Sequence, residues 1–155
     1  MKPEKIISAE ALKLGLEIKR LYLFDTDIIS NVVKKKPSRY LIERLRVIPP
    51  QIQYISTITV GELVYGAFKS DHKEKHLKQL NNKLLPLVQL IPFDNREAFI
   101  YGEIRSKLEK RGIPLSDTDL MIASTALANG FVLITGNERH FTRINDLQVE
   151  NWLIK

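Results

Sequence analysis

The stretch LYLFDTDIISNVV, residues 21–33, contains the features on which the fold prediction depends. Four apolar residues, Leu21 to Phe24, are typical of a short buried strand, and Asp25 follows them directly. From Thr26 to Val33 the apolar residues recur with helical spacing, until Pro37 ends the pattern. This stretch therefore predicts a strand, an acid at its end and then a helix.

Similar alternation continues along the chain. Strand patterns occupy residues 53–56, 88–93, 131–135 and 147–152, and helical patterns occupy residues 40–47, 57–68, 71–85, 94–111 and 116–129. Strands that alternate with helices predict an α/β domain in which a parallel sheet of four or five strands is covered on both faces. We expect residues 21–155 to form this single three-layer domain, with residues 1–20 as a helical N-terminal extension.

Composition narrows the class of protein and its partners. The 155 residues suffice for one domain, and the absence of cysteine excludes disulfides and thiolate metal sites. A net charge of +6 favours binding to polyanions such as nucleic acid. Because the sequence has no long apolar run and no secretory signal, we expect a cytoplasmic protein without a membrane partner.

Four acids lie where a strand pattern gives way to a helix. They are Asp25, Glu62, Asp117 and Asp119. Parallel strands end at one edge of their sheet, so we expect these acids to converge there as oxygen ligands for Mg²⁺ or Mn²⁺. Helix capping by Glu62 and helix-dipole stabilisation by the two aspartates are the alternative explanation. Clustered carboxylates repel each other unless a cation is present, and the pattern therefore predicts metal-assisted phosphodiester chemistry.

Four motifs in order resemble those of the PIN-domain ribonucleases, particularly the VapC-type toxins of prokaryotic toxin–antitoxin pairs. They are LYLFDTDIIS, ISTITVGELVYG, GIPLSDTDLMIASTALANGFVLITGNERHFTRI and LQVENW, and the resemblance covers residues 21–155. It implies a three-layer α/β/α PIN-like fold and an endoribonuclease that depends on Mg²⁺ or Mn²⁺. A metal-activated water would hydrolyse RNA and leave a 5′-phosphate and a 3′-hydroxyl.

The resemblance also implies roles for individual residues. Asp25, Glu62 and Asp119 would be the catalytic acids and metal ligands, with Asp117 as a neighbouring acid that holds the metal directly or through water. Thr26 and Thr135 would support these acids without binding the metal themselves. Asn137 stands where many PIN domains have a further acid, and Asp27 where asparagine is more usual, so that Asp27 either adds negative charge or faces solvent. Arg139 and Arg143 follow the loop at this edge and are expected to bind RNA phosphates.

Partners follow from the same resemblance. A toxin of this kind forms a homodimer and is inhibited by a cognate antitoxin whose C-terminal segment lies across the acidic groove. Two other functions are also considered. A haloacid-dehalogenase-like phosphatase would use Asp25 and Asp27, although Ile28 and Ile29 replace the residues of its usual turn. A catalytically inactive RNA-binding domain would fit a site altered at Asn137.

Overall fold

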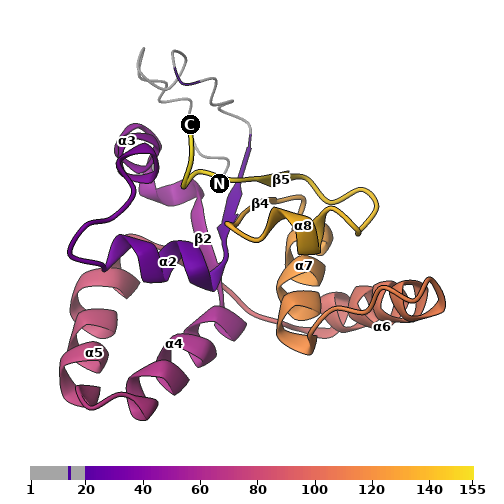
Figure 1. The fold of residues 1–155 in the computed structure, drawn as a ribbon, viewed down its shortest axis with the longest axis horizontal. Helices are drawn as coiled ribbons and strands as arrows, with labels where there is room; N and C mark the ends of the chain where they lie inside the picture. The colour runs from indigo at the N-terminus through magenta and orange to yellow at the C-terminus, as the bar shows by residue number, and fades with distance from the viewer. Residues whose placement is uncertain (1–13, 15–19) are drawn as a thin grey trace.

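The computed structural model describes residue 14 and residues 20–155, and its centre is a five-stranded parallel sheet (Figure 1). The strand order is β3-β2-β1-β4-β5, with every neighbouring pair parallel. The strands are β1 (Tyr22–Phe24), β2 (Gln53–Ser56), β3 (Gln89–Ile91), β4 (Val132–Ile134) and β5 (Val149–Glu150). Their carboxyl ends therefore lie at one edge, which confirms the sheet predicted from the sequence.

Helices cover both faces of the sheet and complete the three layers (Figure 1). They are α2 (Thr26–Val32), α3 (Arg39–Val47), α4 (Thr57–Lys69), α5 (Lys73–Gln79), α6 (Asn95–Lys110), α7 (Asp117–Asn129) and α8 (Glu138–Phe141). Alternate residues of β1 enter two different cores, because side chains of a strand point to opposite faces. Tyr22 and Phe24 pack in a core with α2 and α3, and Leu23 packs in a core with α6 and α7.

Local sequence determines several helix ends. Asp94 and Glu97 form the predicted capping box at the start of α6. The helix α7 ends at Gly130, whose φ of 67° is in the left-handed region that glycine adopts without strain. After α5 the chain makes a π turn at Leu80–Leu84 and a short 3₁₀ turn at Leu85–Leu87, so the predicted helix of residues 71–85 is interrupted.

The C-terminal segment is held against the middle of the sheet. The Trp152 ring lies 4.9 Å from the Tyr22 ring and 5.7 Å from the Phe24 ring, between centroids. Its Nε1 donates a hydrogen bond of 2.8 Å to Glu150 Oε2. Trp152 is 1% exposed, so the end of the chain completes the core around the first strand.

The helix expected in residues 1–20 lies outside the described residues, apart from positions 14 and 20. The four-residue helix α8 was not predicted. Within the part of the chain that the structure describes, no helix has both the length and the apolar character needed to cross a membrane.

Candidate active site

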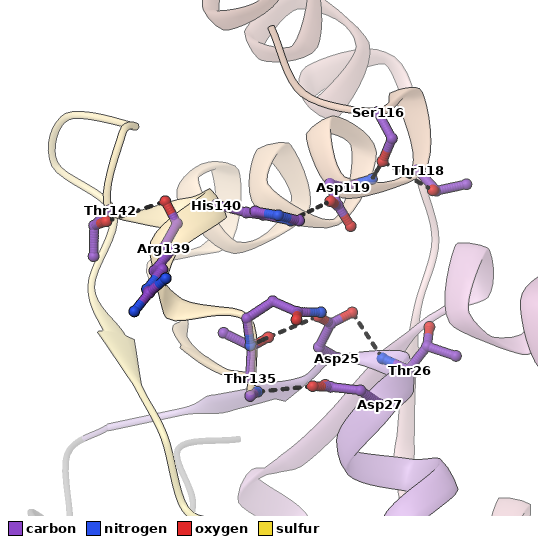
Figure 2. A network of polar contacts seen from close by, with 12 residues as sticks. Asp25, Thr26, Asp27, Ser116, Thr118, Asp119, Thr135, Arg139, His140 and Thr142 are labelled. Carbon is purple, nitrogen blue, oxygen red and sulfur yellow. Dashed lines mark hydrogen bonds and ion pairs between the residues drawn. The ribbon is translucent and has the colours of Figure 1, made fainter. Parts of the chain in front are cut away.

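Asp25 lies at the carboxyl end of β1 and caps α2 (Figure 2). Its Oδ1 accepts a hydrogen bond of 2.8 Å from the Thr26 backbone N–H, and its Oδ2 accepts one of 2.8 Å from Thr135 Oγ1. The residue is only 4% exposed. Burial, followed by the negative charge of Asp27, raises the pKa of Asp25 from 3.8 to about 7 despite these hydrogen bonds. An acid that is this costly to ionise is a strong candidate for a cation ligand.

Asp27 is directed toward the loop after β4, so the solvent-facing alternative does not describe it. Its Oδ2 accepts a hydrogen bond of 2.8 Å from the Gly136 backbone N–H. Its Oδ1 is buried and has no hydrogen-bond partner among the described residues. Burial is the main cause that raises the pKa of this carboxyl, and the charge of Asp119 adds to it. A cation or a proton would relieve this unpaired oxygen.

Thr26 connects Asp25 to Glu62. Its backbone N–H binds Asp25, and its hydroxyl donates a hydrogen bond of 2.8 Å to Glu62 Oε1. Glu62 lies in α4, which begins directly after β2 at the same edge of the sheet. Thr26 thus hydrogen-bonds to two of the predicted acids.

Asp119 comes from the other side of the site. It lies in the first turn of α7, where its backbone N–H donates a hydrogen bond of 3.2 Å to the cap residue Ser116. Figure 2 shows Asp119 and Asp25 facing each other across a gap, with Asp27 beside Asp25. The Oδ2 of Asp119 lies 3.3 Å from Nδ1 of His140 in α8. The structure therefore brings Asp25, Asp27 and Asp119 together. The negative charges of Asp27 and Asp119 raise the pKa of Asp25.

The loop after β4 supports the site through its backbone. Thr135 donates to Asp25 through its hydroxyl, and the same oxygen accepts a hydrogen bond of 3.0 Å from the Asn137 backbone N–H. Asn137 therefore contributes here through its backbone, and its side chain is exposed. A Cβ on Gly136 would lie 2.6 Å from Asp27 Oδ2, so only glycine fits this close approach.

Asp117 lies in the same helical turn as Asp119 but has different partners. Its Oδ1 accepts a hydrogen bond of 2.9 Å from Tyr101 Oη and lies 3.1 Å from Arg105 Nη1, both of which belong to α6. Its side chain is 60% exposed. This ion pair offsets the negative charge with which Asp117 would otherwise attract a metal ion. A direct ligand role for Asp117 stays a prediction.

The two predicted phosphate-binding arginines lie in different places. Arg139 is exposed on α8, the helix that also carries the His140 ring beside Asp119 (Figure 2). Arg143 lines a separate groove of about 500 Å³ with the C-terminal part of α6. Arg139 is therefore the better placed of the two for a substrate at the acids.

The site fits a divalent cation in its donor chemistry. All the candidate ligands are carboxylate oxygens, which Mg²⁺ and Mn²⁺ prefer, and the buried Asp27 Oδ1 lacks a partner. Among residues 14 and 20–155, no three His, Asp or Glu side chains are arranged to hold a metal ion together. Mg²⁺ usually keeps several waters and uses one or two carboxylates, so Asp25 and Asp119 would be sufficient.

Sequence reasoning did not find the neighbour of Asp119 and left the position of Asp27 open. His140 lies on α8, and this helix of four residues is too short to show a periodic pattern in the sequence. For Asp27, the glycine at position 136 was an available signal, because a strand followed by glycine often allows another group to approach closely.

Comparisons with known proteins agree with this fold. A model of the PIN domain matches residues 22–147. A Rickettsia felis protein named ribonuclease VapC2 is 36% identical over 132 residues, which are 85% of this chain and 98% of the relative. A Salmonella typhimurium protein named tRNA(fMet)-specific endonuclease VapC is 33% identical over 131 residues, 84% of this chain and 97% of the relative. The crystal structure of VapBC2 from Rickettsia felis, bound to a promoter DNA fragment, matches with a TM-score of 0.79 at 34% identity, covering 85% of this chain and 98% of that chain.

Proposed function

The chain belongs to the PIN-domain family, and we propose on this premise that it is a divalent-metal-dependent endoribonuclease and the toxin of a VapBC-type pair. The observation that carries the proposal is the meeting of Asp25 and Asp119, from separate parts of the chain, at the carboxyl edge of the sheet. Thr26 links Glu62 to the same group. Carboxylates that only capped their own helices would gain nothing from clustering, and the repulsion between their negative charges would cost free energy.

Each acid has a separate task in this proposal. Asp25 and Asp119 would hold Mg²⁺ or Mn²⁺, and Glu62 would bind the ion or orient a water beside it. When bound, a divalent cation lowers the pKa of a coordinated water and neutralises charge that develops on the phosphate. Thr135 and Thr26 keep the Asp25 carboxylate oriented through their hydrogen bonds. Arg139 is available on the exposed side for an RNA phosphate, and no side chain needs to act as a nucleophile.

The proposed substrate is RNA with accessible, unpaired bases. The net charge of +6 supports attraction to a polyanion. Single-stranded loops expose base edges that an RNA duplex hides, so a loop or a single strand is the expected cleavage site. The Salmonella relative is named for its action on one initiator tRNA, which makes structured tRNA a suitable first substrate to test.

The proposed protein partners are an antitoxin and a second copy of the chain. Structures such as that of VapBC2 from Rickettsia felis contain both members of a toxin–antitoxin pair, which supports a cognate antitoxin here. Large exposed apolar side chains support a dimer. Tyr65 and Phe68 on α4, Leu90 on β3 and Phe99 on α6 are between 48% and 77% exposed. A second copy that covered these side chains would remove their apolar surface from water.

Cleavage of RNA by the purified protein tests the proposal directly. Wild-type protein with Mg²⁺ or Mn²⁺ should cut single-stranded RNA or tRNA, and a chelator should stop the reaction. Asp119→Asn should lower the cleavage rate by about a thousandfold or more, as expected for loss of a group that acts on the transition state. Asp71→Asn, at an exposed position between α4 and α5, should leave the rate unchanged.

Two results would overturn the assignment. Hydrolysis of a small phosphomonoester with RNA left intact would indicate a phosphatase. Tight RNA binding without cleavage at any tested divalent ion would indicate an inactive RNA-binding domain. Growth arrest on expression, reversed by the product of an adjacent gene, would support the toxin role in cells.

A further inference from the structure

A groove opens beside the acids between α2, α4 and α5, and we refer to it as the α2–α4–α5 groove. It has a volume of about 320 Å³. Thr26 and Glu62, which belong to the acidic site, line it together with His76 and Gln79 of α5. In Figure 1, α4 and α5 follow one another along the chain beside α2. A molecule in this groove would therefore contact residues of the acidic site itself.

Most of the groove surface is apolar. Leu63 and Ala67 of α4 and Leu80 and Leu84 of the following π turn are among its lining residues. Pockets for small molecules have roughly 300 to 1,000 Å³, and are mostly apolar with a few polar groups that fix orientation. The α2–α4–α5 groove has these properties at the small end of the range. It accommodates one flat heterocycle and excludes a nucleic-acid duplex.

Hydrogen bonds fix the orientation of the His76 ring. The hydroxyl of Ser70 donates its single hydrogen to the Ala67 carbonyl, over 2.9 Å. Ser70 Oγ also lies 3.0 Å from His76 Nδ1, and this second contact holds the ring in place. Because this contact uses Nδ1, Nε2 of His76 is left for a ligand, as a donor or an acceptor according to the tautomer of the ring.

We propose that the α2–α4–α5 groove binds one unstacked base of the RNA, adjacent to the phosphate that is cleaved. This inference depends on the proposed ribonuclease function. The base lies against the leucines of the groove, and its edge reaches His76. Nε2 of His76 and the amide of Gln79 then hydrogen-bond to polar atoms on the edge of that base. His76 and Gln79 are then residues that determine which RNA sequence is cut.

Continuity with the acids favours a base over a segment of protein. A scissile phosphate held at Asp25 and Asp119 places the neighbouring nucleoside beside Thr26 and Glu62, since Thr26 hydrogen-bonds to both Asp25 and Glu62. The base of that nucleoside, unstacked as in single-stranded RNA, then has the groove within reach. A peptide in the groove is the competing occupant, and the experiment separates the two.

The experiment compares substitutions inside and outside the groove. His76→Ala removes the polar contact, and Gly66→Leu fills the groove from α4, where an added Cβ meets nothing within 4 Å. Leucine also suits a helix interior better than glycine, so this variant should fold. Asn82→Ala is the matched control, because Asn82 is exposed and uncharged and does not line the groove.

The measurement is the sequence at the cut in a pool of single-stranded RNAs with a randomised window, together with KM and kcat for one good substrate. Wild type and Asn82→Ala should share a preference for one base at one position beside the cut. His76→Ala should lose that preference and raise KM about tenfold with kcat nearly unchanged, as expected for one lost hydrogen bond. Gly66→Leu should lower kcat/KM at least as much.

Different outcomes overturn different claims. If the wild type cuts RNA and His76→Ala keeps the same base preference and KM, the base-binding inference is wrong while the ribonuclease function stands. If groove substitutions leave cleavage intact but weaken binding of the antitoxin, the groove is a protein-binding site. If the wild type cuts no RNA, the proposed function itself fails. If His76→Ala does not fold, the same comparison with His76→Asn, which retains a polar side chain, decides the matter.

Discussion

Replacing Asp25 by asparagine should abolish RNA cleavage and at the same time stabilise the metal-free protein at neutral to alkaline pH. Asp25 is 4% exposed, and burial and the charge of Asp27 raise its pKa to about 7. Its carboxylate therefore destabilises the folded state once it is ionised. Asparagine has a similar shape without the charge, so the variant separates the electrostatic cost from packing.

The magnitude follows from the pKa. The difference between 3.8 in the unfolded chain and about 7 in the folded protein corresponds to about 4 kcal/mol. Because the folded pKa is raised, the contribution of this group to stability is complete below about pH 4 and is lost as pH rises through about 7. The amide cannot accept the hydrogen bond from Thr135 at its nitrogen, which costs about 1 kcal/mol. A net gain of about 1 to 3 kcal/mol at about pH 8 is expected.

Urea unfolding with a chelator present, at about pH 8 and about pH 5, measures this effect. The advantage of Asp25→Asn should shrink by about 2 to 3 kcal/mol at the lower pH, where the folded wild type holds a proton on Asp25. Asp71→Asn, at an exposed position, should change stability by less than about 0.5 kcal/mol at both pH values. A stability gain that is the same at both pH values, or no gain, would refute the electrostatic reasoning.

Three further outcomes are expected from the same structure. Mg²⁺ or Mn²⁺ should raise the thermal midpoint of the wild type but not that of Asp25→Asn. The rise should be larger at about pH 8 than at about pH 5, because protons compete with the metal for the carboxylates. Gly136→Ala should lower the free energy of unfolding in urea by about 1 to 3 kcal/mol, because its Cβ would lie 2.6 Å from Asp27 Oδ2. Gly61→Ala is the control, since its Cβ would have nothing within 4 Å. Equal stabilities of the two variants would contradict this reasoning. Asp94→Ala should cost about 1 kcal/mol in the same assay through loss of the capping box, and an unchanged midpoint would show that the cap is dispensable.

Sequence prediction succeeded where local pattern determines position. The apolar run at residues 131–135 became the buried strand β4, and Asp94 with Glu97 became the cap of α6. The alternation of strands and helices was sufficient to place Asp25 at a strand end, because right-handed crossovers leave few arrangements of a parallel sheet.

Positions that depend on tertiary contacts could not be predicted in this way. Asp117 and Asp119 are two residues apart and look equivalent in the sequence. Only the packing of α6 against α7 brings Arg105 to Asp117, while α8 brings His140 to Asp119. Asp27 was similarly ambiguous, since its environment depends on the loop at Gly136, more than a hundred residues later.

The contact of Trp152 with Tyr22 and Phe24 has a consequence during synthesis of the chain. Among the described strands, β1 is the first to leave the ribosome, and it lies in the middle of the sheet. Its partners β4 and Trp152 are made near the end of synthesis. The hydrogen bond from Thr135 to the Asp25 carboxylate also cannot form until Thr135 has been synthesised. Nascent chains therefore cannot complete the contacts around Asp25 until translation is nearly finished.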